Sequence, residues 1–466
     1  MNVVRNSNGR VLDFLGGVQR KVKGFKYRYN KFIVKTEYGE DEFIWYNNLT
    51  GSIISIKDYE VANISTESDD RCSYVDYLIQ NYFLVPEQFD EEDVIKRFRE
   101  RNTVPIDANY LTRLNHFTIM TTTKCNARCF YCYQMHSKHK RHMTEETAHE
   151  VAKYIIDTTR EGQDVTIGWF GGEPLFNYKV MDIITTKVSS SGRPVNSSII
   201  TNGYLFDEKL CKKAVRDWGI QGAQITLDGT EDIYNKAKNF IYKDDKSPFK
   251  TVIKNIHSML KHGISVSVRM NVDLHNVENL TELINYLADE FEGEKNFSAY
   301  IHELFDDTRT IDHDEQLFAN MQEIDKLLVE KGLRTPGYNL PDLIKSVHCM
   351  VDDGRSVVLT PDGKIGLCEH YENEHYVSDL KNPSVIDFEE VRAWREMSEN
   401  AEICEDCPMK PTCLKCKLCP DHKICSAPER DYQLNKMLGD LKVFYEGWIN
   451  MQNNCNCGDN CNCGDN

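Results

Sequence analysis

Residues 117–132 read FTIMTTTKCNARCFYC, and this stretch decides the fold. Its opening, Phe117–Thr121, is apolar and β-branched, which predicts a strand. Cys125, Cys129 and Cys132 follow in a loop with the spacing C-x3-C-x2-C. Cysteine thiolates are the usual ligands of iron–sulfur clusters, normally four for each cubane. Three cysteines leave one iron without a protein ligand, and an open position is how a metal site binds a substrate.

The strand before this loop begins a repeating pattern of apolar strands and amphipathic helices. We predict strands at Phe117–Thr121, Val165–Phe170, Ser197–Thr201, Ala223–Leu227, Val266–Val272 and Ser298–Leu304. Helices are predicted near 145–159, 178–188, 207–217, 248–262, 277–291 and 314–332. Six such steps predict a parallel sheet with crossover helices outside it. The chemical motifs follow strand ends, so a partial (β/α)6 barrel fits this α/β chain better than a doubly wound sheet.

Size and composition narrow the possible functions. The 466 residues predict two to four domains, and 40% hydrophobic residues suffice for a packed core. A formal net charge of −17 argues against nucleic acid as a partner, because phosphate backbones need clustered Lys and Arg. No apolar run approaches the roughly 18–20 residues of a membrane span. The polar first ten residues lack the apolar core of a secretory signal. We therefore expect a cytoplasmic protein without a membrane partner.

The chain has 17 cysteines, which is unusual for such a protein. A reducing cytosol disfavours disulfides, so clustered cysteines indicate metal or redox ligands. Only Cys72 and Cys211 stand alone, and the others lie within 125–132, 349–425 and 455–463. For the first group, spacing alone leaves open a zinc site completed by a residue such as His136 or His139.

Glycine and polar residues end the strands that follow the cysteine loop. Gly171-Gly172-Glu173-Pro174 ends the second strand, where two glycines permit a close backbone approach and Glu173 is a candidate acceptor for an ammonium group. Standing alone, this motif would be a plain turn. The later strand ends carry Thr201-Asn202-Gly203, then Thr226-Leu227-Asp228-Gly229, then Arg269-Met270-Asn271. Each of these residues is either a ligand contact or an ordinary polar group at a sheet end.

Residues of roughly 115–305 resemble the radical SAM superfamily, whose signature is C-x3-C-x-aromatic-C with Tyr131 in the aromatic position. The resemblance implies a [4Fe–4S] cluster on Cys125, Cys129 and Cys132. The open iron would bind S-adenosylmethionine (SAM), which is cleaved reductively to a 5′-deoxyadenosyl radical. It also implies that Tyr131 lies near the adenine and that Gly171, Gly172, Glu173 and Pro174 contact the SAM amino group. Thr201, Asn202, Asp228, Arg269 and Asn271 complete the expected SAM site, with Asp228 toward the ribose or shaping the cavity and Arg269 toward the carboxylate.

The second cysteine group comprises Cys349, Cys368, Cys404, Cys407, Cys413, Cys416, Cys419 and Cys425. Eight thiols suit two four-ligand clusters, although C-x2-C pairs also suit zinc. The arrangement resembles the SPASM extension of radical SAM enzymes, because it contains Gly363-x4-Cys368 and C-x2-C-x5-C. It departs where Lys417 occupies the position of the next expected thiol.

The SPASM resemblance implies two auxiliary [4Fe–4S] clusters. The first would use Cys349, Cys368 and Cys416 or Cys419. The second would use Cys404, Cys407, Cys413 and Cys425 or Cys419. The domains expected are 1–110 (small α+β), 111–335 (radical SAM barrel), 336–430 (auxiliary clusters), 431–452 (helix) and 453–466 (flexible tail).

SPASM enzymes mostly modify peptides and proteins, so we expect a ribosomally made precursor peptide as the substrate. Phe25–Lys35, Phe43–Tyr46 and Ser52–Ile56 are predicted strands, with helices at Tyr74–Phe83 and Glu91–Arg101. This N-terminal unit resembles a winged-helix-like domain that binds a leader peptide as an added edge strand. A purely structural cap is the alternative.

The expected reaction is the formation of thioether crosslinks, driven by a flavodoxin- or ferredoxin-like electron donor. Formylglycine formation, as in sulfatase maturation, and carbon–carbon crosslinking are rivals within the class. A zinc-stabilised binding protein and an RNA-modifying enzyme are rivals outside it. The tail cysteines, Cys455, Cys457, Cys461 and Cys463, alternate with Asn and Gly. They suit a soft metal, cluster delivery, thiol exchange or substrate mimicry, or form an inert low-complexity end.

Overall fold

The computed structural model describes residues 1–466 except for thirteen gaps. These gaps are 23–24, 63–72, 108–109, 137–139, 245, 305–313, 336–339, 342–343, 345–353, 371–374, 397–400, 414–424 and 455–466. Several predicted residues lie outside the described residues, namely Cys72, Cys349, Cys416, Lys417, Cys419, Cys455, Cys457, Cys461 and Cys463.

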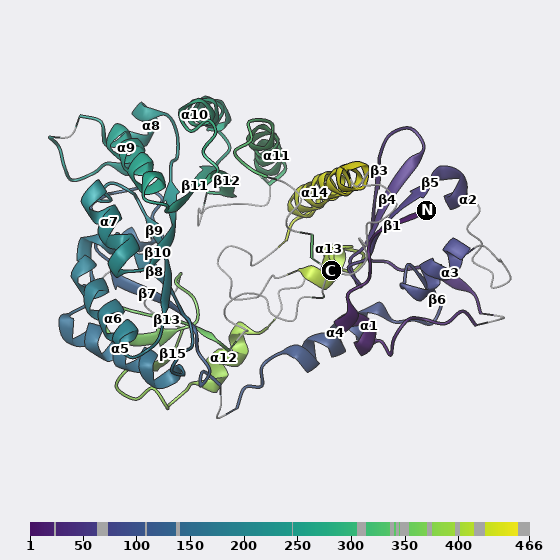
Figure 1. The fold of residues 1–466 in the computed structure, drawn as a ribbon, viewed down its shortest axis with the longest axis horizontal. Helices are drawn as coiled ribbons and strands as arrows, with labels where there is room; N and C mark the ends of the chain where they lie inside the picture. The colour runs from purple at the N-terminus through teal and green to yellow at the C-terminus, as the bar shows by residue number, and fades with distance from the viewer. Residues whose placement is uncertain are drawn as a thin grey trace.

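A mostly parallel α/β sheet forms the centre of the larger part of the molecule (Figure 1). Its parallel strands are β7 (His116–Thr122), β8 (Val165–Gly171), β9 (Val195–Thr201), β10 (Ile220–Thr226), β11 (Ser265–Val272) and β12 (Phe297–Glu303), paired in sequence order. The helices between and after them are α5 (Glu145–Thr158), α6 (Tyr178–Ser190), α7 (Glu208–Asp217), α8 (Glu231–Lys238), α9 (Pro248–Lys261), α10 (Val277–Glu290) and α11 (Asp314–Glu330). The six predicted strands and the six predicted helices are all present, and α8 was not predicted.

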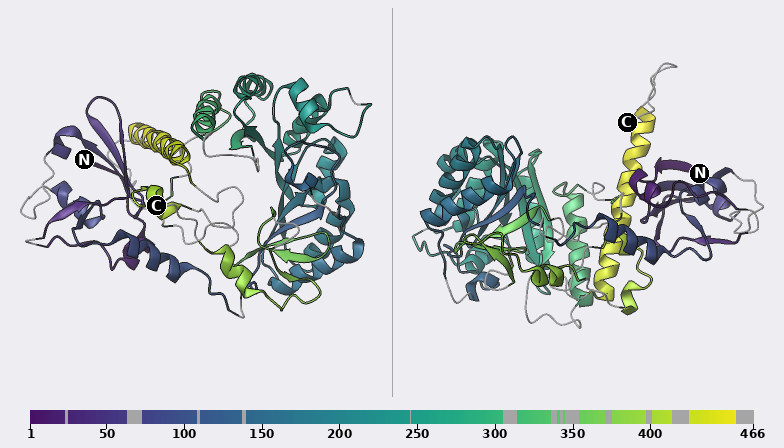
Figure 2. Two further views of the ribbon diagram at one scale, coloured as in Figure 1. Left: turned by 180° about the vertical axis from the view of Figure 1, so that it is seen from behind. Right: turned by 90° about the horizontal axis from the view of Figure 1, so that it is seen from below.

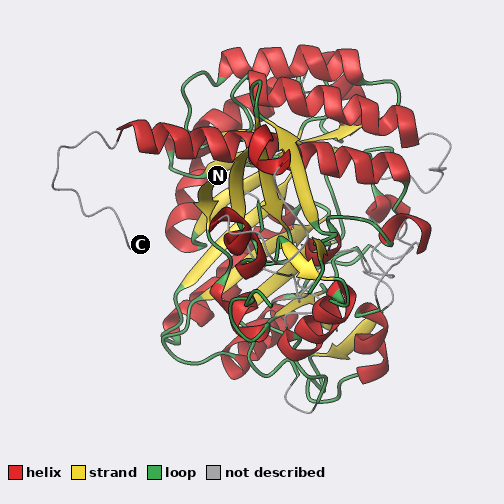
Figure 3. Cartoon of the chain, turned by 90° about the vertical axis from the view of Figure 1, so that its right-hand side faces the viewer, coloured by secondary structure: helices red, strands yellow, loops and turns green. Residues whose placement is uncertain are grey.

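Alternating side chains explain why helices cover one face of this sheet. In β8, Val165, Ile167 and Trp169 are fully buried, whereas the alternate residues Thr166, Gly168 and Phe170 are only partly buried. A strand of period two directs its apolar residues to one face, and that face packs against helices. Figure 3 shows red helices flanking the yellow strands. In β11, Arg269 and Asn271 alternate with the buried Val268, Met270 and Val272, so they lie on the other face of the sheet.

Three C-terminal strands extend the same sheet beyond β7. They are β13 (Ser356–Leu359), β14 (Lys364–Gly366) and β15 (Tyr376–Asp379). β13 pairs in parallel with β7, and β14 and β15 follow in antiparallel order. This part of the second cysteine region thus belongs to the central sheet, a pairing that the sequence did not predict. The predicted domain boundaries themselves stay predictions.

The N-terminal unit contains a four-stranded antiparallel sheet of order β1-β5-β4-β3, instead of the three strands predicted. Its strands are β1 (Asn2–Arg5), β3 (Ile33–Glu37), β4 (Glu42–Asn47) and β5 (Ile53–Lys57), and a separate pair is β2 (Tyr27–Tyr29) with β6 (Leu84–Pro86). The helices are α1 (Gly9–Phe14), α2 (Asp58–Ala62), α3 (Ser73–Gln80) and α4 (Glu91–Asn102).

The predicted strand Phe25–Lys35 is wrong as a single element, because it divides at Asn30. The Asn30 side chain accepts a hydrogen bond from the Phe32 amide at 2.9 Å and donates one to the Tyr82 carbonyl at 3.1 Å. An asparagine that bonds the backbone two residues ahead makes a turn. The two halves therefore join different sheets.

The long helix α14 (Ala427–Asn454) connects the two parts of the molecule. Leu441 and Tyr445 are buried against Ile44 and Tyr46 of β4, and α14 also packs against α11. Figure 2 shows the yellow helix running between the barrel and the N-terminal unit. The remaining elements are α12 (Phe388–Trp394), α13 (Ala401–Cys404) and the 3₁₀ helices Tyr133–His136, Pro174–Asn177 and Lys410–Thr412. None of the helices in the described residues is long and apolar enough to cross a membrane.

Candidate functional site

The cysteine loop leaves the carboxyl end of β7. The Thr122 hydroxyl starts the turn, since it accepts a hydrogen bond from the Lys124 amide at 3.0 Å. The Ala127 amide then points at Cys125 Sγ at 3.3 Å, and the Cys132 amide donates to the Cys129 carbonyl at 3.3 Å. All three predicted cysteines are partly buried and form no disulfide with another described residue. This loop therefore directs a backbone donor at sulfur, which suits a thiolate ligand.

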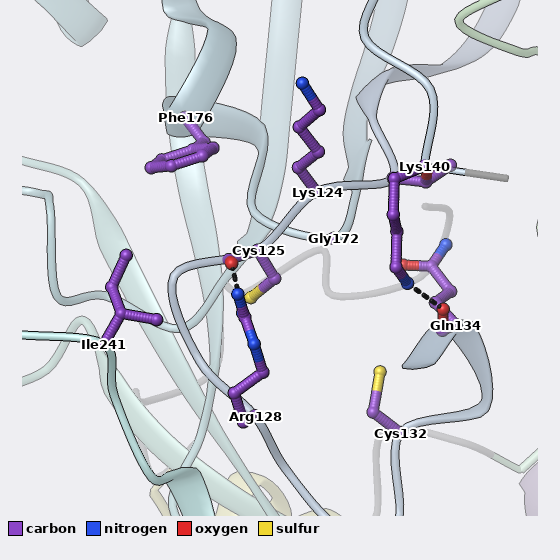
Figure 4. A pocket seen from close by; sticks show the side chains of 10 residues that line it. Lys124, Cys125, Arg128, Cys132, Gln134, Lys140, Gly172, Phe176 and Ile241 are labelled. Carbon is purple, nitrogen blue, oxygen red and sulfur yellow. Dashed lines mark hydrogen bonds between the residues drawn. The ribbon is translucent and has the colours of Figure 1, made fainter. Parts of the chain in front are cut away.

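Two of the three thiols face one cavity. Cys125 and Cys132 line a space of about 300 Å³ together with Gly172, whose backbone comes from the next strand end. Figure 4 shows both sulfur atoms at this cavity. Within the described residues, no three Cys, His, Asp or Glu side chains are already gathered at metal-binding distance.

Gly171 and Gly172 allow the end of the second strand to lie directly against the cysteine loop. A Cβ on Gly171 would lie 2.2 Å from the Thr122 carbonyl oxygen, and one on Gly172 would lie 2.4 Å from that of Lys124. Gly171 also has a φ of 126°, which other residues rarely adopt. Two hydrogen bonds join these segments, from Gly172 N to Thr122 O at 2.8 Å and from Glu173 N to Lys124 O at 3.0 Å. The two glycines thus permit close backbone contact between the end of β8 and the cysteine loop.

Glu173 is fully buried beneath this contact. Its carboxylate accepts from the Thr201 hydroxyl at 2.8 Å, the Asn202 amide at 2.9 Å and the Leu175 amide at 3.1 Å. Burial raises the pKa of Glu173 to about 7, although these hydrogen bonds oppose the rise. The carboxylate that sequence reasoning assigned to an ammonium ligand therefore ties the second strand end to the third. Pro174 begins the 3₁₀ helix after it, where the Thr121 hydroxyl donates to its carbonyl at 2.9 Å.

Tyr131 and Asp228 belong to a second buried network. The Tyr131 hydroxyl donates a short hydrogen bond to Asp228, and Asn271 Nδ2 donates to the other Asp228 oxygen at 2.7 Å. Arg269 Nε in turn donates to Asn271 Oδ1 at 3.0 Å. The structure thus brings together the predicted residues of the cysteine loop and of the fourth and fifth strand ends. Their contacts with SAM stay predictions.

Lys238 completes this network, and sequence reasoning missed it. Its ammonium lies 2.9 Å from Asp228 Oδ2 and 2.6 Å from the Tyr131 hydroxyl, with the side chain only 3% exposed. Burial alone would lower the pKa of Lys238, but Asp228, with Tyr131 and Cys129 nearby, holds it well above the usual range. In the sequence, a lysine at the end of an amphipathic helix is typical of a solvent-exposed residue. Its charge was therefore the only feature that could have indicated a partner in the site.

The residues of the loop fit an iron–sulfur cluster with an open iron. Burial, reinforced by the nearby Glu173, raises the pKa of the Cys125 thiol to about 12, so a bound cation is needed to make it a thiolate. Asn126 Nδ2 is buried beside Cys125 and has no partner in the described part of the chain. Cluster sulfur accepts such hydrogen bonds. The donor set of three thiols, an amide directed at sulfur and an unused buried donor is consistent with that group.

Five cysteines of the second group are described: Cys368, Cys404, Cys407, Cys413 and Cys425. Burial raises the pKa of Cys407, and the thiols of Cys413 and Cys404 add to the rise. Arg430 lies near enough to Cys407 and Cys425 for both to raise its pKa, after its own bond to Asp431. Cys404 and Cys413 therefore lie near Cys407, and Cys407 and Cys425 both lie near Arg430, but no three of these thiols are at metal-binding distance in the described residues. Cys368 lies elsewhere, packed on the barrel core after β14.

Residues 119–289 match the family model of the Radical SAM superfamily. An uncharacterised protein of Methanocaldococcus jannaschii, MJ0907, is 26% identical over 60% of this chain and 93% of its own length. A GTP 3′,8-cyclase of Campylobacter jejuni subsp. doylei is 22% identical over 57% of this chain and 84% of that protein. The solved structure of native anSMEcpe with bound AdoMet shares the fold, with a TM-score of 0.50, 15% identity, and coverage of 73% of this chain and 100% of that one.

Proposed function

We propose that this protein is a radical SAM enzyme that modifies a ribosomally made precursor peptide. The observation that carries the proposal is the close backbone contact of the cysteine loop with Gly171 and Gly172, within the residues that match the radical SAM family model. Cys125, Cys129 and Cys132 would hold the [4Fe–4S] cluster. When bound, that cluster and SAM supply reductive cleavage to a 5′-deoxyadenosyl radical, which takes a hydrogen atom from the substrate.

The side chains around the cluster would bind and orient SAM. Asn202 lies within reach of Cys125, since its Nδ2 is 3.7 Å from that sulfur. Tyr131 is held by Asp228 and Lys238, which suits a fixed face for the adenine. Arg269 keeps guanidinium donors beyond its single bond to Asn271, so it suits the SAM carboxylate. Asp228 already has three partners, and we propose that it shapes the cavity.

We further propose two auxiliary clusters in the C-terminal region. Cys404, Cys407, Cys413 and Cys425 would hold one, which is supported by Cys404 and Cys413 lying near Cys407 and by Cys407 and Cys425 lying near Arg430. Cys368 would contribute to the other with Cys349 and Cys416 or Cys419, which lie outside the described residues. A cluster with an open iron would bind a substrate thiolate. This capacity makes thioether formation our first choice, ahead of formylglycine formation and carbon–carbon crosslinking.

The N-terminal unit supports a peptide substrate. Among the described strands, β3 is the outermost one on one side of its sheet, so its outer edge suits an added peptide strand. A cavity of about 230 Å³ lies next to this strand on the face of the sheet, lined by Lys35 and Glu37 of β3 and by their cross-strand partners Trp45 and Phe43 of β4. The Lys35 ammonium sits 4.1 Å from the centre of the Trp45 ring. A leader peptide would add its backbone to β3 and place an apolar side chain in this cavity.

Anaerobic reconstitution tests the proposal. We expect about 12 irons for each chain, from three four-iron clusters. Cys129→Ala should abolish 5′-deoxyadenosine formation, whereas Cys211→Ala, which removes a lone buried thiol on α7, should retain it. Cys407→Ala should keep SAM cleavage and lose peptide modification, measured by mass spectrometry of a coexpressed cysteine-rich peptide.

Two results would contradict the proposal. If the protein is colourless, binds zinc and forms no 5′-deoxyadenosine, it is not a radical SAM enzyme. Turnover of GTP with no change in any peptide would favour a nucleotide substrate, as the names of the cyclase relatives suggest for those proteins.

A further inference from the structure

Lys238, at the end of α8, is a buried cation. Its side chain is only 3% exposed, and no other lysine or arginine among the described residues is buried to this degree. A buried ion pair adds little net stability, because taking both charges out of water costs about as much free energy as their attraction returns. An apolar pair of similar volume would serve the fold as well. The pairing of Lys238 with Asp228 is therefore not explained by stability alone.

Two contacts fix Lys238 to the cysteine loop, one on each side of Cys129. The Arg128 amide donates to the Lys238 carbonyl at 2.8 Å. The Lys238 ammonium lies 2.6 Å from the Tyr131 hydroxyl. In the sequence, Arg128 directly precedes Cys129 and Tyr131 follows it by two positions. The ammonium is therefore held beside the segment of the loop that carries Cys129.

The charge of Lys238 acts on this segment with little screening by water. Burial alone would lower the pKa of Lys238, but Asp228, Tyr131 and Cys129 hold it well above the usual range, so the side chain is a cation. Reduction of a cluster on the loop would add one negative charge close to this cation. A fixed positive charge in a site without water favours the more negative state. Nearby charge is one of the properties that set the reduction potential of an iron–sulfur cluster.

We propose that Lys238 raises the reduction potential of the cluster bound by Cys125, Cys129 and Cys132. This inference rests on the proposed function, since it needs a [4Fe–4S] cluster in the cysteine loop. Lys238 belongs to α8 and is not a ligand, so it acts through its charge alone. Loss of this charge makes the one-electron reduction of the cluster less favourable while the three thiol ligands stay unchanged.

Substitutions that separate charge from shape test the proposal. Lys238→Gln removes the charge but keeps an N–H donor for Asp228, whereas Lys238→Arg keeps the charge. Lys236→Gln, an exposed change on the same helix, is the matched control. The midpoint potential is measured by electron paramagnetic resonance during titration of the reconstituted enzyme with dithionite, which supplies the electron, in the absence of SAM. The signal of the loop cluster is the one that is missing from the Cys129→Ala protein.

Lys238→Gln should lower the midpoint potential of the loop cluster by about 59 mV or more, which is a tenfold loss in the equilibrium constant of a one-electron reduction. Lys238→Arg should stay close to the wild-type potential, and Lys236→Gln should not shift it. Equal potentials in Lys238→Gln and the wild-type protein would overturn the proposal. A Lys238→Arg potential as low as that of Lys238→Gln would also overturn it, because shape and not charge would then decide the potential.

A second comparison keeps the test available if Lys238→Gln does not fold. Asp228→Asn leaves no buried carboxylate that needs Lys238 as its partner, so the lysine can be replaced in that background. Asp228→Asn with Lys238→Gln should have a lower midpoint potential than Asp228→Asn alone, and equal potentials would overturn the proposal.

Two further results separate the possible failures. An unchanged potential in Lys238→Gln together with weaker SAM binding, measured by equilibrium dialysis, would overturn the proposal and make Lys238 a SAM contact. A wild-type chain that binds no cluster in the loop would contradict the proposed function itself. A loop cluster whose potential does not depend on Lys238 would contradict only the role of this residue.

Discussion

At the scale of single residues, Glu173 shows how burial changes the role of a motif residue. In sequence it is a free acceptor in a GGEP turn, but in the structure three donors from the second and third strand ends occupy it. A buried carboxylate is costly unless it is fully hydrogen-bonded. Its main task in the folded chain is to hold Thr201 and Asn202 in position.

Glu173 should make stability depend on pH. Its folded pKa of about 7 lies above the usual value of 4.5, so the folded state binds the proton more tightly. The contribution of Glu173 to the free energy of unfolding is then greatest below about pH 4.5. It falls as the pH rises to about 7, by about 3 kcal/mol at most. Glu173→Gln should flatten this fall, measured by denaturant unfolding of the cluster-free protein between pH 5 and pH 8. Exposed Glu294→Gln should keep the fall of the wild-type protein, and a fall that survives Glu173→Gln would assign it to another group.

At the scale of elements, the site depends on how closely two loops approach. Gly172 should not tolerate a methyl group, because the added Cβ would lie 2.4 Å from the Lys124 oxygen. Gly172→Ala should therefore displace the cysteine loop and weaken SAM binding at least tenfold, measured by equilibrium dialysis. Gly222→Ala on β10 is the matched control, because its Cβ would meet only the Ser265 oxygen at 3.8 Å. Equal binding by both variants would show that the loop contact does not shape the site.

Lys238 links α8 to the cysteine loop. Lys238→Met would leave Asp228 buried without its cation, which should cost about 3–5 kcal/mol of unfolding free energy. Lys238→Arg should recover part of this loss. Lys236→Met, an exposed change on the same helix, should have little effect. Chemical denaturation checks the order of the four proteins, and a neutral Lys238→Met would mean that Asp228 is satisfied by Tyr131 and Asn271 alone.

At the scale of the whole molecule, the N-terminal unit holds the second cysteine group. Asn48 donates to the Pro408 carbonyl at 2.8 Å, and Arg99 of α4 donates to the Lys410 carbonyl at 2.9 Å. Lys410 also pairs with Glu92 at 2.9 Å. Hydrogen bonds and an ion pair thus join the segment that carries Cys407 and Cys413 to the unit proposed to bind the leader peptide. The unit proposed to bind the leader peptide therefore contacts the segment proposed to hold an auxiliary cluster.

Loss of the hydrogen bond from Arg99 to Lys410 should increase local opening of the segment that carries Cys407 and Cys413. Arg99→Ala removes a charged hydrogen-bond donor worth about 1.5 kcal/mol, so amide exchange near residues 405–413 should accelerate about tenfold. Arg97→Ala, an exposed residue on the same helix paired with Asp93, should leave that exchange unchanged. Hydrogen–deuterium exchange with mass spectrometry compares the two variants. An unchanged rate in Arg99→Ala would show that Asn48 and Lys410 suffice.

The sequence by itself determined the six parallel strands, the position of the cysteine loop and the strand ends that meet it. These features follow from local periodicity, which reports the buried face of each element. The tertiary structure was needed to place β13 beside β7, α14 across the N-terminal sheet, and Lys238 on Asp228. Such contacts join residues far apart in the chain. Their stability comes from burial and charge pairing in three dimensions, and no local pattern encodes it.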